Sequence, residues 1–304
     1  MTSPVSGRAW MLYALMAVLW GIPYLFIKEA VATFSPPEIV AGRTLLAAAI
    51  LVPFAWRQRA LGPALRVWPW VLAFGAIEMA GPFVLLSHAE KTISSGLTGL
   101  LVATVPLFAT IIAVIRGDRS MLTPWRVGGL LIGFAGVAVI VSAHGLAVSG
   151  PESLVAIGEV LLVAVLYAIA PFIISSRLQG VPALGSVTLS LIAVGLFYLP
   201  IALLMPHEPP TVRSAGALVL LAVLCTAAAF IGFFALIREV GPVRAPLFTY
   251  VNPVVAIVLG ILILNEEITV GLLLGFPLVL LGCWLAATGG QIRSRRRRHM
   301  ARGA

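Results

Sequence analysis

Charged residues are scarce in this chain, and their scarcity is the first constraint on its class. Only 10% of the 304 residues are Asp, Glu, Lys or Arg, whereas soluble domains usually carry about 25%. Hydrophobic residues make up 61% of the chain, and the mean hydropathy is +1.09. The composition therefore excludes a soluble domain and indicates an all-α integral membrane protein.

Residues and motifs that carry catalytic chemistry are also few. The two cysteines, Cys225 and Cys283, lie in apolar segments without a CxxC, so we expect neither a metal site nor a disulfide. HExxH, GxSxG, Walker and GxGxxG motifs are all missing, so we expect no enzyme and no cofactor. Without a P-loop, energy for transport would come from a gradient, from exchange, or from neither in a uniporter.

Long apolar runs, by contrast, recur along the whole sequence. Ten windows of roughly 20 residues are each long enough to cross about 30 Å of hydrocarbon. The breaks between them are short and carry turn or charge signals such as "FSPPE", "RGDRS" and "MPHEPP". The windows are 10–31, 36–56, 69–90, 95–115, 124–143, 153–175, 182–204, 214–237, 244–264 and 270–289.

Lys and Arg are distributed unequally over the breaks between these windows. With both termini in the cytoplasm, most arginines fall on the inner side, whereas the outer side holds only Lys28, Lys91 and Arg213. We therefore expect a multi-pass protein of the cell (inner) membrane with cytoplasmic termini. The arginine-rich tail 291–304 is expected to meet anionic lipid rather than nucleic acid.

An internal repeat divides the chain into two halves of five windows. We assign residues 8–143 to the first half, 144–152 to a linker loop and 153–290 to the second half. Because five is odd, the second half must cross the membrane inverted, as in secondary transporters whose substrate site lies between two inverted repeats. An offset of 147 pairs Trp20 with Tyr167, Pro53 with Pro200, Phe83 with Phe230 and Pro106 with Pro253, and an offset of 146 pairs Gly129 with Gly275 and Gly136 with Gly282.

Three stretches of the sequence resemble one transporter family. "LWGIPYLFIKEA", "PPEIVAGRTLLAAAI" and "NPVVAIVLGILILNEEITVGLLLGFPLVLLG" are similar to segments of EamA-type transporters of the drug/metabolite transporter superfamily. The family pattern that closes each half fits Pro253, Glu266, Thr269 and Gly275, whereas Ser120 stands at the acidic position of the first half. The resemblance implies a ten-helix carrier, and the exporters of aromatic amino acids are the subtype that it suggests.

Ionisable residues at membrane depth are costly and are often functional. Glu78 lies about ten residues into its span and is a candidate to bind a substrate amine or a proton, or it is a buried acid bonded to a neighbouring helix. Arg43 is a candidate for a substrate carboxylate, but we favour a structural role in which it pairs with Glu159 or snorkels outward.

Aromatic and amide side chains form a second candidate set. Trp20, Tyr24, Tyr167, Tyr250 and Asn252 suit the wall of a cavity for an amphipathic solute, although tryptophan and tyrosine also serve as packing or interfacial anchors.

One histidine and three prolines complete the candidates. His88 is able to titrate near neutral pH, but a lone histidine near the end of a span is more often simply solvated. Pro23, Pro106 and Pro253 are expected to be hinges, because proline removes a backbone donor inside an apolar helix. GxxxG spacings from Gly129 and Gly271 permit close helix approach within one chain or between two, so a monomer and a homodimer both stay open.

These observations together predict a carrier for small molecules. We expect two inverted five-helix repeats that export amino acids or similar small metabolites by alternating access. Export of cationic drugs or other metabolites is the alternative within the same class. A membrane-embedded enzyme and a passive channel are the alternatives from other classes.

Overall fold

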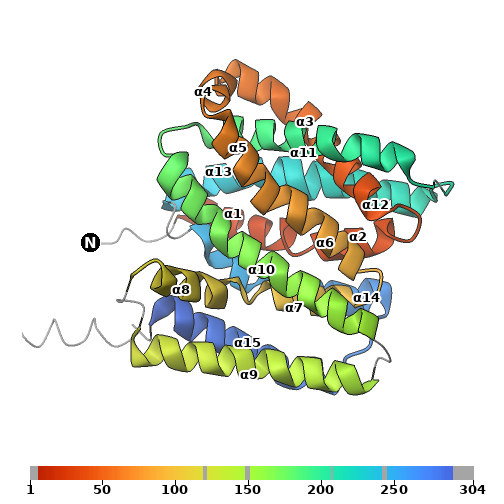
Figure 1. The fold of residues 1–304 in the computed structure, drawn as a ribbon, viewed down its shortest axis with the longest axis vertical. Helices are drawn as coiled ribbons and strands as arrows, with labels where there is room; N and C mark the ends of the chain where they lie inside the picture. The colour runs from red at the N-terminus through yellow and green to blue at the C-terminus, as the bar shows by residue number, and fades with distance from the viewer. Residues whose placement is uncertain (1–5, 119–121, 148–150, 207, 242–244, 290–304) are drawn as a thin grey trace, which may run out of the picture.

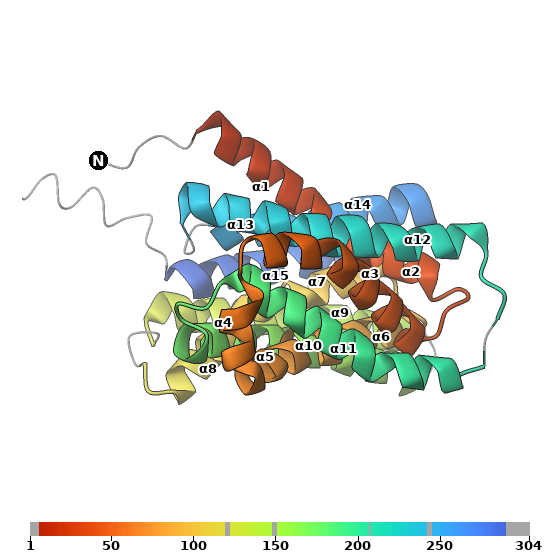
Figure 2. The ribbon, with the colours of Figure 1, turned by 90° about the horizontal axis from the view of Figure 1, so that it is seen from above.

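A computed structural model of the chain describes residues 6–118, 122–147, 151–206, 208–241 and 245–289. The predicted basic tail, 291–304, lies outside the described residues. The helices run broadly parallel to one another, as Figures 1 and 2 show. Within the described residues, nine helices are long and apolar enough to span a membrane, and a tenth, Phe248–Leu264, is shorter. The predicted all-α membrane fold is confirmed.

The first half contributes five membrane segments, several of them interrupted. A short helix, α4 (Leu61–Arg66), joins the second segment to the third. The segments are α1 (Gly7–Leu19) with α2 (Pro23–Ala30), α3 (Pro36–Arg57), α5 (Trp68–Gly75) with η1 (Ala76–Ala80) and α6 (Gly81–Ala89), α7 (Ser95–Val102) with α8 (Val105–Ile115), and α9 (Pro124–Ala147).

The second half contributes the other five segments. Helix α9 ends at Ala147 and α10 begins at Pro151, so much of the predicted linker 144–152 is helical, and residues 148–150 lie outside the described part of the chain. The segments are α10 (Pro151–Arg177), α11 (Ala183–Leu204), α12 (Val212–Ala222) with η3 (Val223–Ala228) and α13 (Ala229–Val240), η4 (Ala245–Tyr250) with α14 (Asn252–Leu264), and α15 (Val270–Thr288).

The helices pair across the two halves as an inverted repeat requires. The fifth segment packs on the tenth (α9 on α15), the second on the seventh (α3 on α11) and the fourth on the ninth (α7 on α14). The first segment packs on the eighth. In the equivalent contact of the inverted repeat, the third segment packs on the sixth. Because each contact has its mate in the other half, the two halves are related by a pseudo-two-fold axis that passes between them.

Glycines make the contact between α9 and α15 a close one. A Cβ on Gly129 would lie 2.5 Å from the backbone nitrogen of Ala286, and one on Gly282 would lie 2.3 Å from the nitrogen of Gly133. A Cβ on Gly136 would lie 3.0 Å from the carbonyl oxygen of Gly275. The small residues therefore serve packing within one chain, in keeping with the use of glycine where membrane helices approach closely.

The two ends of the bundle differ in their aromatic residues. We call them the Lys28 end, where α2 and α6 finish, and the Arg57 end, where α3 finishes. Trp10, Trp56, Trp68 and Trp125 are all exposed and all lie near the Arg57 end. Tryptophan favours the membrane–water interface, so these side chains mark the headgroup level at that end.

Candidate functional site

A cavity of about 260 Å³ lies where helices of the two halves are interrupted. Its volume is near the lower limit of roughly 300 Å³ that is usual for small-molecule sites. Several repeat pairs line it together, among them Trp20 with Tyr167, Phe83 with Phe230, and Pro106 with Pro253. The cavity therefore lies on the pseudo-two-fold axis. Its other lining residues include Pro23, Tyr24, Ile27, Arg43, Glu78, Met79, Leu86, Val102, Cys225, Thr249, Tyr250 and Asn252.

Each proline that we expected to be a hinge stands in the first turn of a helix that follows a break. Pro23 opens α2 after a turn at residues 20–22, Pro106 is the second residue of α8, and Pro253 is the second residue of α14. Proline is tolerated at this position because the first backbone N–H groups of a helix have no intrahelical acceptor. The breaks leave backbone groups that only a cavity or protein can satisfy at membrane depth.

The sixth segment does not share the break of its repeat mate. Its proline, Pro171, lies one position beyond the repeat mate of Pro23. Helix α10 instead runs without interruption from Pro151 to Arg177, with Pro171 inside it. The two halves therefore differ at this position, because a proline inside a helix can kink it without dividing it.

Glu78 projects from a short π-helix, η1, inside the third segment. The residue at the same position of the second half is Cys225, and it also lies in a π-helix, η3. Both side chains line the cavity, and π-helical turns inside α-helices are frequent at functional sites. Among the described residues, none forms a hydrogen bond to the Glu78 carboxylate; Tyr198 of α11 instead donates to the backbone carbonyl of Ala80 at 3.1 Å.

Arg43 is buried on α3 and is held by the second half. Its Nε donates to the Thr226 hydroxyl over 2.8 Å, and its guanidinium carbon lies 3.7 Å from the centre of the Phe83 ring. The expected pairing of Arg43 with Glu159 was wrong, because Glu159 lies at the surface and pairs with His88. Thr226 and Phe83 hold the guanidinium where it lines the cavity.

Two tyrosines bring hydroxyl groups to the charged residues. Tyr167 of α10 lies close enough to Glu78, Tyr24 and Arg43 to interact with all three electrostatically. Tyr24 of α2 is buried and interacts in the same way with Arg43. The acid, the guanidinium and both hydroxyls thus face one small space, as the sequence pattern suggested without being able to place them together.

Trp20 forms the aromatic wall toward the Arg57 end of the cavity. Its ring centroid lies 5.0 Å from that of Phe233, 5.4 Å from that of Phe248 and 5.9 Å from that of Phe230. Asn252 is adjacent, and with its side-chain amide oriented to satisfy its neighbours, the amide nitrogen donates to the carbonyl oxygens of Phe248 and Ala17 over 3.3 Å. Tyr250, at the end of η4, completes this wall.

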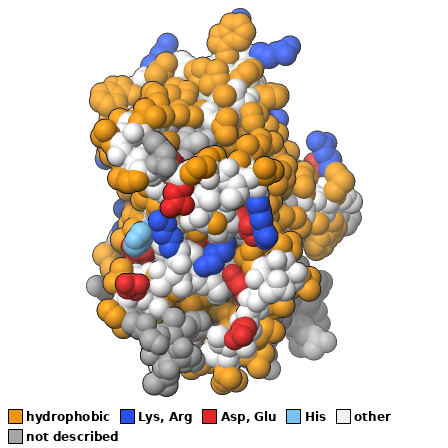
Figure 3. Space-filling view, turned by 90° about the vertical axis from the view of Figure 1, so that its right-hand side faces the viewer, with side chains coloured by type: hydrophobic (Ala, Val, Ile, Leu, Met, Phe, Trp, Pro, Cys, Tyr) orange, Lys and Arg blue, Asp and Glu red, His pale blue; other side chains and the backbone are white. Residues whose placement is uncertain are grey.

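His88 lies outside the cavity. It is exposed at the Lys28 end, and its Nδ1 lies 2.9 Å from a carboxylate oxygen of Glu159. The charged side chains at this end gather near the middle of the face in Figure 3. The geometry matches the solvated histidine that the sequence also allowed.

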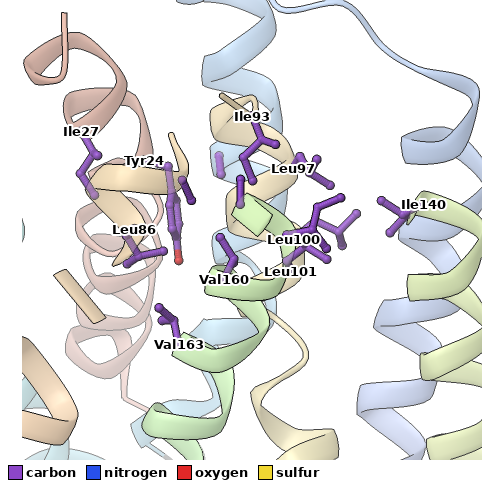
Figure 4. Close-up of a cluster of buried hydrophobic side chains, with 14 of the residues drawn as sticks. Tyr24, Ile27, Leu86, Ile93, Leu97, Leu100, Leu101, Ile140, Val160 and Val163 are labelled. Carbon is purple, nitrogen blue, oxygen red and sulfur yellow. The ribbon is translucent and has the colours of Figure 1, made fainter. Parts of the chain in front are cut away.

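Packed side chains close the cavity toward the Lys28 end. Ile27 and Leu86 line it there, with exposed fractions of 1% and 3%, and Leu97 of α7 is fully buried beyond them. Figure 4 shows this cluster, with Tyr24 beside Leu86 and with Leu97 and Leu100 on α7. Lining residues farther from this end, such as Val102, are partly exposed.

Some residues of the site carried a signal that the sequence analysis did not use. Cys225 was expected to form neither a metal site nor a disulfide, and the offset of 147 that pairs Trp20 with Tyr167 also pairs it with Glu78. Glu266 was known only from the family pattern. In the structure its carboxylate accepts hydrogen bonds from the backbone nitrogens of Ser95 at 2.7 Å and Gly96 at 3.1 Å, and it thereby caps α7.

Comparison with known families agrees with this architecture. The sequence profile of the EamA-like transporter family matches residues 8–142 and again residues 155–288. The chain belongs to the EamA-like transporter family. It is therefore a multi-pass membrane transporter of the drug/metabolite transporter superfamily, as the resemblance implied.

Relatives of similar length are also described as transporters. An uncharacterized transporter of Archaeoglobus fulgidus is 28% identical over 91% of this chain and 98% of its own length. The inner membrane transporter YedA of Escherichia coli is 29% identical over 84% and 82%, and the transporter YvbV of Bacillus subtilis is 26% identical over 92% of each. A crystal structure that is 22% identical covers 93% of this chain and 98% of its own with a TM-score of 0.66, so it shares the fold.

Proposed function

We propose that this EamA-like transporter exports amino acids or similar small zwitterions by alternating access. The single observation that carries the proposal is the lining of the cavity, where one acid and one guanidinium stand among aromatic rings. A zwitterion needs both charges to be matched, because a charge taken out of water without a partner is costly. Glu78 would bind the amine and Arg43 the carboxylate.

The aromatic walls favour a solute with an apolar part. Trp20, Tyr24, Tyr167 and Tyr250 offer ring faces, and a ring face also attracts a cation. The volume of about 260 Å³ suits a single small metabolite. Neutral and aromatic amino acids are therefore the preferred candidates.

The direction of transport and the orientation of the chain belong to the same proposal. We place the Arg57 end in the cytoplasm, because arginines such as Arg57, Arg59 and Arg66 cluster there. The cavity is closed toward the opposite, outer end. Substrate would enter it from the cytoplasm, after which the two halves rock about the site and open the Lys28 end.

Counterflow in proteoliposomes tests the proposal. Vesicles containing the purified protein are loaded with one unlabelled compound, and uptake of its labelled form is followed for amino acids, nucleobases and organic cations in turn. We expect saturable counterflow with neutral or aromatic amino acids. Counterflow with organic cations alone would favour the alternative substrate class, and a covalent product would favour an enzyme.

The competing cationic substrate has weaker support from the cavity lining. Glu78 and the ring faces would suit an organic cation, but Arg43 lines the same cavity and would repel it. Replacing Arg43 would therefore improve the binding of cations while it abolishes the binding of amino acids. This opposite response separates the two substrate classes.

A further inference from the structure

Glu90 is a buried acid that the proposed substrate site does not use. It follows α6 directly, one residue beyond the membrane segment Trp68–Ala89, and its exposed fraction is 0%. Neither of its carboxylate oxygens accepts a hydrogen bond from any described residue. Buried polar groups are nearly always hydrogen-bonded, and an unpaired buried carboxylate is costly. The Glu90 carboxylate therefore needs a binding partner that the neighbouring side chains do not supply.

The surroundings of Glu90 hold the Lys28 end closed. The Lys28 ammonium donates to the backbone carbonyl oxygens of Glu90 at 2.6 Å and of Ile93 at 2.9 Å, which ties α2 to the turn between α6 and α7. Glu266, from the turn between α14 and α15, caps α7 beside them. The Ser95 hydroxyl in the same place is also buried without a partner. Segments of both halves thus meet at one polar cluster.

Two charges act on the Glu90 carboxyl: the Lys28 ammonium and the Glu266 carboxylate. Its electrostatic influence also reaches the Tyr24 hydroxyl in the cavity wall. Other charged groups described at this end pair elsewhere or lie in solvent. These are His88 with Glu159 on α10, Arg213 on α12 with Glu29, Glu38 on α3 with Ser35, and the exposed Lys91, Glu152, Glu208 and Glu267.

We propose that Glu90 is a proton-binding latch that couples closure of the outer end to the outer pH. When the end closes, the Glu90 carboxylate takes one proton from outer water and enters the cluster as a neutral carboxyl. When the end opens, water reaches the carboxyl and the proton returns to the outer solution. This inference rests on the proposed function, because it needs a carrier that opens at the Lys28 end.

The direction of the pH effect follows from burial. Burial raises the pKa of the Glu90 carboxyl well above its usual range; the Lys28 ammonium lowers this pKa, and the Glu266 carboxylate raises it further. In the open end the hydrated carboxyl would return toward its ordinary pKa of about 4.3. The stabilisation of the closed state is thus fully present below the open-state pKa and is lost as the pH rises through the closed-state pKa.

A proton fits this place better than a metal ion. Hard metal cations need about six oxygen ligands, whereas two backbone oxygens of the cluster already bind the Lys28 ammonium. A metal ion would stand beside that positive charge. A proton needs no additional ligands and removes the unpaired charge.

The repeat restricts the latch to one end. At the offset of 147, the mates of Lys28 and Glu90 are Ser175 and Ile237, which lie toward the Arg57 end. Neither mate can carry the charges that the latch needs. The closure of the outer end is therefore expected to sense pH, whereas closure of the opposite end has no equivalent device at these positions.

Thiol labelling in nanodiscs tests the latch without any substrate. Leu97→Cys, in a background with Cys225→Ala and Cys283→Ala, reacts with a soluble maleimide only when the Lys28 end opens, because Leu97 is fully buried. At each pH from about 5 to about 9, its rate is divided by that of the exposed Lys91→Cys, which corrects for thiol ionisation. We expect the ratio to rise by about tenfold with pH, a change of about 1.4 kcal/mol in closure.

Variants with an uncharged residue at position 90 distinguish a Glu90 that binds and releases a proton from one that stays ionised beside Lys28. With Glu90→Gln, or Glu90→Leu if the former is poorly folded, the ratio should stay low at every pH. Glu29→Gln and His88→Gln should keep the rise, and Lys28→Met should label quickly throughout. A rise that persists in both Glu90 variants, fast labelling of Glu90→Gln at all pH values, or loss of the rise in His88→Gln would each overturn the latch. Failure of amino-acid counterflow would refute the proposed substrate and leave this measurement unaffected.

Discussion

At the scale of single residues, the candidate site combines charges that differ in how they are held. Arg43 is fixed by the Thr226 hydroxyl and the Phe83 ring, so its position does not depend on substrate. Glu78 accepts no hydrogen bond from the described residues and faces the cavity from a π-helical turn. A fixed cation and an unsatisfied acid together form a site that is complete only when a ligand supplies the missing donor.

The first prediction concerns the acid. Glu78→Gln keeps the shape and removes the charge, so it should weaken amino-acid binding by about 1.5–3 kcal/mol, or about tenfold to a hundredfold. Counterflow at a range of concentrations measures the change. Glu267→Gln, at an exposed position, is the matched control. Unchanged flux in Glu78→Gln would remove this residue from the proposed site.

The second prediction concerns the support of Arg43. Thr226→Val removes the hydroxyl that accepts from Nε and leaves a buried donor without a partner, so the free energy of unfolding should fall by about 1–3 kcal/mol. Thr226→Ser keeps the hydroxyl and should cost much less. Thermal unfolding in detergent compares the two. Equal stability of Val and Ser variants would show that the hydrogen bond does not hold Arg43.

At the scale of helices, interruptions are what bring the site together. The first, fourth and ninth segments are divided near Pro23, Pro106 and Pro253, and the third and eighth contain π-helical turns. All of these places border the cavity. Away from these places, glycines let the α9–α15 pair pack closely.

The third prediction treats the interrupted helices as hinges. Pro106→Ala and Pro253→Ala allow the following helix to extend backward through the break, which should slow turnover by about tenfold, a barrier change of about 1.4 kcal/mol. Substrate affinity should change less. Pro53→Ala, at a lipid-exposed site within α3, is the control. Equal losses of turnover and affinity would indicate misfolding instead of a hinge.

The fourth prediction concerns packing between α9 and α15. Gly129→Ala places a Cβ 2.5 Å from a backbone nitrogen of α15, and overpacking of this kind usually costs about 1–3 kcal/mol. The neighbouring Gly128 has nothing within 4 Å, so Gly128→Ala should be neutral or slightly stabilising. Thermal unfolding of both variants checks this. Equal melting temperatures would contradict the close contact.

At the scale of the whole molecule, two inverted halves enclose one cavity but do not carry equal chemistry. The acid Glu78 has Cys225 as its mate, and Arg43 has Ser190. Among the described residues that line the cavity, the charged ones therefore come from the first half, while the second half supplies Thr226 to hold Arg43. The same asymmetry leaves the Lys28–Glu90 cluster at one end only.

The fifth prediction concerns orientation in the membrane. In intact cells, an impermeant maleimide should label Lys91→Cys, at the Lys28 end, and should label Arg59→Cys, at the Arg57 end, only after the membrane is permeabilised. Both residues are exposed, so access to water alone decides the result. The native cysteines are buried and contribute little background. The reverse pattern would place the termini outside and turn the proposed exporter around.

The sequence by itself determined the membrane class, the ten segments and their division into two inverted halves. These features follow from local composition and spacing, since apolar length fixes a span and an odd number of spans inverts the repeat. The repeat also placed Trp20 with Tyr167 and Pro106 with Pro253, and all four line the cavity.

Only the tertiary structure decided which polar groups meet. By its depth in the membrane alone, Glu159 is a plausible partner for Arg43. The rotation of each helix about its own axis and the packing of α3 against η3 instead place the Arg43 side chain beside Thr226. The π-helical turns and the unbroken α10 were equally hidden, because backbone hydrogen bonding in a membrane depends on neighbouring helices as much as on the segment's own residues. Burial of Glu90 belongs to the same class, since it arises where four separate segments converge.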